Sequence, residues 1–279
     1  MAESLDDLIK LDEIPVLENG TLLLAFTGWM DGGDVSTGTV NRIVDLVDAK
    51  QIGEVDAEPF YLYSFPGSME LAAHFRPRIN IEEGLVKSIE MPVNRIHAAP
   101  DSNLAFFVGK EPNLKWPTFC KCVFELCKRL KITRLLFVGS FGGAVPHTRE
   151  PRLYVACSKE SMHDEMSQYG LRKTNYEGPG SFMTYMMTRA SEVGLEMASL
   201  VAEIPGYLQG LNPYSIEAMT RRLSKILKLP LELDELRQAT NEWEEEITDL
   251  ISANNEMSAK IRELEDDYDN DLLDMNDVR

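Results

Sequence analysis

The chain has 279 residues, of which 44% are hydrophobic, and a formal net charge of −18. A chain of this length and composition can bury a large core, which excludes a protein that is disordered throughout. The negative charge argues against nucleic acid and anionic membranes as partners, because both carry dense negative charge themselves.

The N-terminal segment has none of the features of a secretory signal. It reads Met-Ala-Glu-Ser-Leu-Asp-Asp, without a basic region. No apolar run in the chain approaches the ~20 residues that a helix needs to cross a bilayer. We therefore expect a cytoplasmic protein with no membrane partner.

The first half of the chain alternates predicted strands and helices after a polar, irregular stretch over residues 1–20. Residues 21–27 are predicted as a buried strand, and residues 28–34 turn it into a helix. Asp34 is the predicted N-cap of that helix, because its carboxylate can accept a backbone hydrogen bond. Shorter strands are predicted over residues 60–64, 78–81, 85–89 and 92–98, with a turn at residues 82–84.

The second half continues the alternation. A strand over residues 103–109, a helix with Pro117 in its first turn and a strand over residues 135–138 form a unit whose two strands are predicted to be parallel. The later predicted elements are a strand over residues 152–157, a helix over 159–169, a loop over 176–181, a helix capped by Ser181, a strand over 195–204 and a helix that begins at Asn212 and Pro213. This order predicts an α/β fold with one mostly parallel sheet, covered by helices on both faces.

The C-terminal part differs from this α/β domain, which we assign to residues 1–231. Residues 232–279 carry 17 Asp and Glu against four Lys and Arg. We expect one long acidic amphipathic helix over residues 232–268, followed by a disordered acidic tail over residues 269–279. Its apolar seam repeats at steps of three and four and consists of Trp243, Ile247, Leu250, Asn254, Met257, Ile261, Leu264 and Tyr268. We expect the α/β domain or another subunit to cover this seam, because monomers rarely expose such a stripe.

The candidate ligand-binding residues follow two buried strands. Ligands of parallel sheets gather at the carboxyl ends of the strands. The loop after residues 21–27 and the stretch after residues 135–138 should therefore meet at one edge, and Glu177 would join them if its loop folds onto that edge. The candidates are Asp31, Gly32, Gly33, Gly139, Ser140, Gly142, Gly143, His147, Arg149 and Glu177. His147 and Arg149 could form an anion site or an acid–base pair, or they could have purely structural roles.

Several kinds of chemistry lack their sequence signals. The glycines do not have the spacing of a dinucleotide-binding loop, and Asp31 and Asp34 would repel a phosphate. Ser140 lacks the strand-turn-helix setting of a hydrolase nucleophile. Cys120, Cys122 and Cys127 share a predicted helix without metal-site spacing, which favours buried thiols. We assign no catalytic residue, no metal and no cofactor.

Four segments together resemble the proteasome assembly chaperone 2 family, in its bacterial and archaeal branch. They are Gly28-Trp-Met-Asp-Gly-Gly33, the run from Gly139 through Val145-Pro-His-Thr-Arg149, Gly178-Pro-Gly180, and Ile204-Pro-Gly-Tyr207 leading to Pro213. The resemblance covers residues 20–230. It implies a three-layer α/β/α sandwich like that of nucleoside phosphorylases, and a homo-oligomer, with a trimer as one arrangement.

The resemblance also implies a scaffolding activity rather than a reaction. Eukaryotic relatives help to build the proteasome α-ring, and some archaeal relatives bind proteasomes through a C-terminal hydrophobic-Tyr-any residue motif. This chain ends Met275-Asn-Asp-Val-Arg279 without that tyrosine, so whether it contacts a proteasome stays open. We expect a non-enzymatic, oligomeric assembly scaffold. The alternative is an enzyme that acts on a small molecule at the glycine-rich strand ends.

Overall fold

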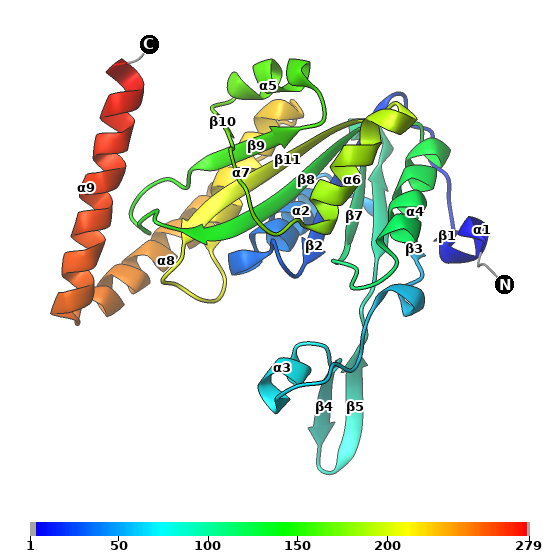
Figure 1. The fold of residues 1–279 in the computed structure, drawn as a ribbon, viewed down its shortest axis with the longest axis horizontal. Helices are drawn as coiled ribbons and strands as arrows, with labels where there is room; N and C mark the ends of the chain where they lie inside the picture. Colours follow the sequence, from blue (N-terminus) through cyan, green and yellow to red (C-terminus); the bar gives the residue numbers. More distant parts are fainter. Residues whose placement is uncertain (1–3, 278–279) are drawn as a thin grey trace.

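The fold is built on one large sheet, which crosses the body of the molecule in Figure 1. The structure is a computed structural model that describes residues 4–277. Within that range the strand order is β1-β3-β6-β7-β2-β8-β11-β9-β10. In chain order the strands are β1 (Ile9–Leu11), β2 (Gly20–Thr27), β3 (Lys50–Val55), β6 (Arg95–Ala99), β7 (Leu104–Lys110), β8 (Ile132–Gly143), β9 (Leu153–Cys157), β10 (Arg172–Lys173) and β11 (Glu196–Pro205).

The four central strands are parallel. Leu22 of β2 lies opposite Ala105 of β7 on one side and Leu135 of β8 on the other, and β8 continues in parallel register with β11. The predicted parallel arrangement of residues 104–108 and 135–138 is confirmed, with β2 between them. The flanking strands run the other way, because β6 pairs antiparallel with β7 and β9 pairs antiparallel with β11.

Helices cover both faces of the sheet, which confirms the predicted three-layer α/β/α sandwich. Successive side chains of a strand point to opposite faces. Leu22, Leu24 and Phe26 of β2 therefore pack against α4 (Trp116–Arg129) and α6 (Phe182–Ala190). Leu23 and Ala25 of β2 enter a second core, on the face of α2 (Val35–Leu46), α5 (Glu160–Ser167) and α7 (Pro213–Ile226). Figure 1 shows α4 and α6 in front of the sheet, and α2 and α7 behind it.

The predictions for the N-terminal region were partly wrong. Residues 60–64 are not a strand: a 3₁₀ turn, η2 (Glu58–Phe60), leads into a loop, and the Tyr61 hydroxyl binds the carbonyl oxygen of Lys110 at 2.7 Å. The edge strand β1, the adjacent strand β3 and the short helix α1 (Leu5–Leu8) were missed. Charged residues and Gly53 interrupt the apolar pattern of β3, which lies near the margin of the sheet between β1 and β6.

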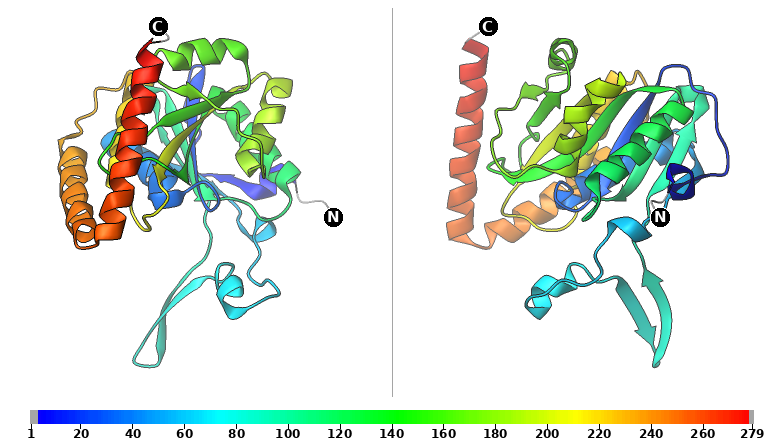
Figure 2. Two further views of the ribbon diagram at one scale, coloured as in Figure 1. Left: turned by 60° about the vertical axis from the view of Figure 1, so that its left-hand side comes forward. Right: turned by 45° about the vertical axis from the view of Figure 1, so that its right-hand side comes forward.

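A separate module, residues 64–93, projects from the body (Figures 1 and 2). It contains the short helix α3 (Met69–Ala73) and a two-stranded antiparallel sheet of β4 (Arg78–Glu82) and β5 (Leu85–Glu90). The predicted turn between the strands is confirmed: Glu83 and Gly84 both have positive φ, at 52° and 79°, as the tight turns of hairpins require. We call residues 64–93 the hairpin module.

The C-terminal arm, residues 234–277, consists of two helices instead of the single predicted one. They are α8 (Asp234–Ser252) and α9 (Asn255–Asp277). The chain turns at Asn254, whose side-chain oxygen accepts the backbone N–H groups of Glu256 and Met257 at 3.0 and 3.2 Å. Asn254 is thus a helix cap and not a seam residue. The predicted disorder from residue 269 is also wrong, because α9 continues to Asp277; residues 278–279 lie outside the described range.

Candidate functional site

The loop after β2 is fixed by Asp31. Its carboxylate accepts the backbone N–H of Thr37 at 3.0 Å and the Thr37 hydroxyl at 2.8 Å. Burial is the main reason why the pKa of Asp31 rises to about 6. Asp34 occupies the predicted N-cap position of α2, but the predicted capping bond is absent: the residue has a left-handed conformation (φ 53°) and its side chain makes no capping hydrogen bond. Asp31 instead ties the loop to the first turns of α2.

This loop also joins the strands and helices next to it. Gly33 has φ 64°, and a Cβ there would lie 2.8 Å from Cβ of Asn212, so a larger residue would separate the loop from the start of α7. The Gly32 carbonyl accepts the Ser140 hydroxyl at 2.7 Å, and the Met30 carbonyl accepts the Ser140 backbone N–H at 2.9 Å. The two predicted glycine-rich segments therefore do meet. Ser140 is buried, and its hydroxyl serves this junction.

The glycines after residue 138 are part of β8 and not of a loop beyond it. Gly142 pairs with Ile204 and Gly143 pairs with Pro205 of β11. A Cβ at Gly143 would lie 2.3 Å from Oε1 of Glu203, and one at Gly139 would lie 2.7 Å from the ring of Phe137. Close packing within the fold therefore accounts for these glycines. The loop that follows the carboxyl end of β8 begins at Ala144.

The buried carboxylate of Glu203 binds the start of this loop at the carboxyl end of β8. Its Oε1 accepts the backbone N–H of Ala144 at 2.8 Å, and its Oε2 lies 3.4 Å from Nη1 of Arg152 and 3.3 Å from the Tyr154 hydroxyl. Glu203 was not among the predicted site residues. A glutamate near the end of an otherwise apolar strand was the available signal, because buried carboxylates are rare unless they are paired.

His147 is 2% exposed and bridges the sheet edge to the C-terminal arm. Its Nδ1 lies 2.8 Å from the Tyr207 hydroxyl and its Nε2 lies 3.2 Å from Oγ1 of Thr248 in α8. The His147 backbone N–H donates to the same Tyr207 oxygen at 2.8 Å. A neutral imidazole satisfies both ring contacts, with one nitrogen as donor and the other as acceptor, because each hydroxyl can take either role. Burial lowers the pKa of His147, which favours this neutral form.

The next residues, Thr148 and Arg149, bind α9. The Thr148 hydroxyl donates to the carboxylate of Glu265. Arg149 donates from Nε and Nη2 to the two carboxylate oxygens of Asp269, each at 2.9 Å. This pair raises the pKa of Arg149 and lowers the pKa of Asp269. The Val-Pro-His-Thr-Arg run is therefore a docking site for the protein's own C-terminal arm.

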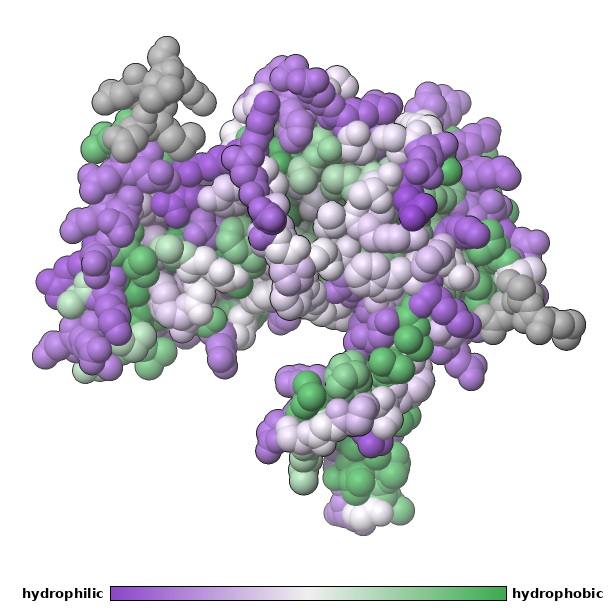
Figure 3. All heavy atoms as spheres, viewed as in Figure 1, coloured by the Kyte–Doolittle hydropathy of each residue, from purple (hydrophilic) through white to green (hydrophobic). Residues whose placement is uncertain are grey.

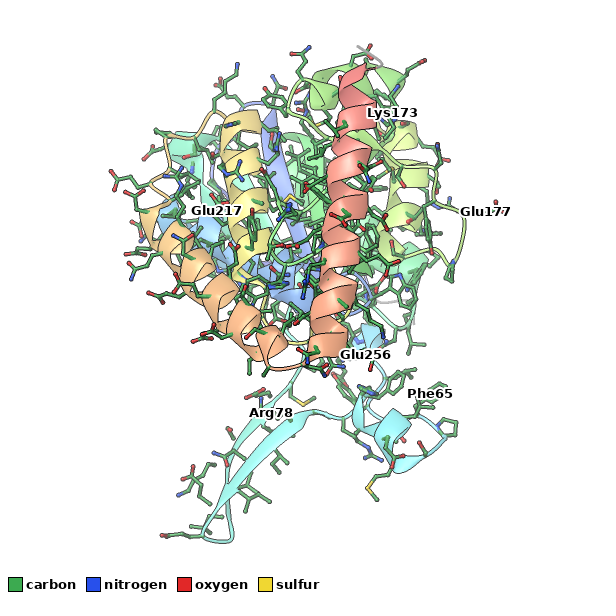
Figure 4. All side chains as sticks on the ribbon, turned by 90° about the vertical axis from the view of Figure 1, so that its left-hand side faces the viewer. Phe65, Arg78, Lys173, Glu177, Glu217 and Glu256 are labelled. Carbon is green, nitrogen blue, oxygen red and sulfur yellow. The ribbon has the colours of Figure 1, made fainter. Side chains whose placement is uncertain are left out.

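A second set of contacts continues this docking surface. The guanidinium of Arg152 lies over the ring of Tyr268, 4.4 Å from its centroid, and the Tyr268 hydroxyl donates to the carbonyl of Glu150 at 2.8 Å. Asp271 bridges Arg152 and Arg172, at 3.3 and 3.0 Å. Figure 4 shows α9 standing against this side of the body. These acidic partners were not predicted, because they lie far from their arginines in the chain, 99 residues apart for Arg172 and Asp271.

The predicted single site is only partly assembled. Asp31 and His147 share the carboxyl-end edge of parallel strands, but in the part of the chain that the structure describes no hydrogen bond joins them: Asp31 binds Thr37, while His147 binds Tyr207 and Thr248. Glu177 does not join them, because it is an exposed residue on an outlying loop (Figure 4). Its glycine-rich segment turns away from the arm.

Two further properties bear on the range of functions. Over residues 4–277, no three His, Cys, Asp or Glu side chains are grouped so that they could hold a metal ion. No helix in that range combines the length and apolar character that a membrane crossing needs.

Comparisons with known proteins place the chain in a family. The model of the PAC2 family matches residues 25–251. A proteasome-assembly chaperone homologue of Mycobacterium tuberculosis is 27% identical, with a TM-score of 0.73, over 86% of this chain and 99% of that chain. The archaeal homologue PbaA of Pyrococcus furiosus is 18% identical, with a TM-score of 0.60, over 94% and 98% of the two chains. No curated protein matches. The chain belongs to the PAC2 family.

Proposed function

We propose that this protein is a non-enzymatic scaffold that self-associates and takes part in proteasome-related protein assembly. The family relationship supports an assembly role, since structural relatives are described as a proteasome-assembly chaperone homologue and as an archaeal proteasome activator. The compartment that suits this role is the cytoplasm. The arm and the α/β domain act in this proposal as one body, from which the hairpin module projects.

The exposed apolar surface of the hairpin module carries the proposal. Every residue of β4 and β5 is exposed. The hydrophobic side chains include Ile79, Ile81, Leu85, Val86 and Ile89, each between 51% and 63% exposed. Figure 3 shows this surface as a concentration of hydrophobic residues on the projecting module. Monomeric proteins rarely project such a patch, and unpaired strand edges favour pairing with another chain. A second copy of this chain is the proposed occupant.

The contacts of the polar side chains at the carboxyl ends of the strands support a structural role rather than catalysis. Ser140 donates to a backbone carbonyl, His147 lies between Tyr207 and Thr248, and Arg149 is held by Asp269. A general base or nucleophile must reach a substrate. In this arrangement the C-terminal arm and the protein's own backbone occupy the groups that could act in that way.

The register of the hairpin provides a matched test of self-association. Ile79 lies opposite Ile89, and Asn80 lies opposite Ser88. Because neighbouring residues of a strand face opposite sides, I79K/I89K charges one face and N80K/S88K adds the same charge to the other. Light scattering should give an oligomer for the wild type and for N80K/S88K, and a monomer for I79K/I89K. An unchanged mass for I79K/I89K would overturn the proposed interface.

The proposed partner, the proteasome, is tested in a separate experiment. Affinity capture with the wild-type protein from its own cells, followed by mass spectrometry, should enrich proteasome subunits. I79K/I89K used in the same way shows whether capture depends on self-association. Recovery of this chain alone, at protein concentrations where it is oligomeric, would leave the self-associating scaffold and remove the proteasome from the proposal.

A further inference from the structure

A cavity of about 410 Å³ lies where the hairpin module meets the body. Thr27 and Lys110, the last residues of β2 and β7, form one wall, and Thr37 and Asn41 of α2 contribute polar groups. Both legs of the hairpin module close the other side and contribute Phe75, Arg76, Arg78, Glu90 and Met91; Tyr63, which directly precedes the module, also lines the cavity. The cavity thus lies at the carboxyl ends of two neighbouring parallel strands, where sheets of this type bind ligands. Figure 4 labels Arg78 at this junction.

The lining is strongly basic in an acidic protein. It contains Arg76, Arg78, Arg95 and Lys110, against one carboxylate, that of Glu90. Over residues 4–277, none of these four cations forms an ion pair with a carboxylate. Elsewhere the acidic groups do neutralise arginines: Arg134 binds Glu165 and Glu196. Four cations that share one cavity repel each other, and a bound anion would remove that repulsion.

Lys110 shows the same lack of a counter-charge. It is half-buried, and its ammonium lies 6.0 Å from the centroid of the Tyr61 ring. Burial lowers the pKa of Lys110, and no neighbouring carboxylate opposes that shift. A lysine in this position gains from an anionic ligand, because the ligand supplies the charge that its surroundings lack.

We propose that this cavity binds a small phosphorylated molecule. Guanidinium groups match phosphate oxygens with pairs of parallel hydrogen bonds, and a phosphate offers three acceptor oxygens to the several donors here. Thr27 and Asn41 add neutral polar groups, while Tyr63 and Phe75 offer apolar surface for the rest of the molecule. The volume lies within the range of about 300–1,000 Å³ that is usual for small-molecule sites. The ligand would bridge the hairpin module and the body.

The experiment is calorimetric titration of the full chain with inorganic phosphate, adenosine 5′-monophosphate and citrate. R78A/R95A removes one arginine from each side of the cavity. K87A/R262A is the matched control, because Lys87 and Arg262 are exposed, carry the same charge and do not line the cavity. We expect saturable binding of at least one phosphate compound, about tenfold or more weaker in R78A/R95A and unchanged in K87A/R262A. Circular dichroism should give the same spectrum for all three proteins.

The other outcomes decide against the proposal. An absence of saturable binding to either phosphate compound would overturn the site. Equal weakening by K87A/R262A would replace it with general charge attraction, and citrate binding tighter than both phosphate compounds would overturn the phosphate assignment. Hydrogen exchange gives an independent check: a bridging ligand should slow exchange in residues 64–93. These results do not depend on self-association, since I79K/I89K leaves the cavity lining intact and can be titrated in the same way.

Discussion

Arg149 and Asp269, which are 120 residues apart in the chain, form a two-pronged ion pair that fastens α9 to the edge of the sheet. Arg149 immediately follows Thr148, which binds Glu265 one turn earlier on the same helix. Two consecutive residues of the Val-Pro-His-Thr-Arg run therefore contact successive turns of the acidic arm.

Arg149→Ala should loosen α9 without unfolding the body. The pair is exposed, so it contributes to docking of the helix and little to the core. We expect faster hydrogen exchange in residues 255–273 and an unchanged rate in β2 and β8. R262A is the control, because Arg262 lies on α9 and its Nε donates to the Ser258 carbonyl of its own helix. Raising the salt concentration should loosen wild-type α9 in the same direction, since salt screens exposed pairs.

Tyr268 is a buried residue of α9 that contacts Glu150 and Arg152, and we expect it to dominate docking of the helix. It is 7% exposed, its ring lies under Arg152, and its hydroxyl donates to the carbonyl of Glu150. Tyr268→Ala should destabilise the docked arm by about 3 kcal/mol, as large aromatic truncations do. Tyr268→Phe keeps the ring and should cost about 1 kcal/mol, the net contribution of one hydrogen bond. Protease cleavage rates within α9 measure both; equal rates for the two variants would contradict a dominant role of the ring.

His147 should make stability depend on pH in the acidic range. Its folded-state pKa lies below the ordinary value of about 6.5, so the folded state disfavours the charged form. The stability that neutral His147 contributes is therefore present above about pH 6.5 and is lost as the pH falls through the lower, folded-state pKa. His147→Gln keeps a donor and an acceptor but does not titrate, so urea unfolding between pH 7.5 and 5 should show a flatter profile. His74→Gln, at an exposed position of the hairpin module, should leave the profile unchanged.

Local sequence patterns predicted the centre of the fold well. Apolar runs such as Leu22 to Phe26 are buried by both helical layers and need no information from distant residues. The hairpin at Glu83 and Gly84 was predictable for the same reason, because turn geometry depends on adjacent residues. Strand β3, which lies near the margin of the sheet, was missed because charges and a glycine interrupt its apolar pattern.

The candidate site was harder to predict because its partners are distant in sequence. The glycines of β8 were interpreted as an open loop, although the packing of Glu203 and Phe137 requires them. The prediction of the apolar seam was correct in α9, where Ile261 and Tyr268 are buried. In α8 the buried residues are Thr240 and Ile251, while Leu250 is 70% exposed. The break at Asn254 shifts which face of each helix meets the body, and the periodicity of a single helix could not reveal that shift.

Asp31→Asn is expected to stabilise the protein at neutral pH. Burial raises the pKa of Asp31 to about 6 from an ordinary value near 3.8, so the fold disfavours the ionised carboxylate. For an acid whose pKa is raised on folding, the favourable contribution is complete below the unfolded pKa and is lost as the pH rises through the folded pKa. The free-energy cost of burying the ionised Asp31 carboxylate is therefore absent near pH 4 and fully present above pH 7. Asparagine removes it and still offers one oxygen to the Thr37 backbone N–H, so we expect a gain of about 1 kcal/mol at pH 8.

The measurement is urea unfolding of Asp31→Asn and the wild type at pH 8 and pH 4.5. The difference in unfolding free energy should favour the variant at pH 8 and shrink or reverse at pH 4.5, where the wild-type carboxyl is already protonated. Asp34→Asn is the companion variant. The Asp34 charge also raises the pKa of Asp31, but it ranks below burial, so its removal should give a smaller gain at pH 8. A loss of stability in Asp31→Asn at pH 8 would mean that the two bonds to Thr37 need the charge and outweigh the cost of burying it.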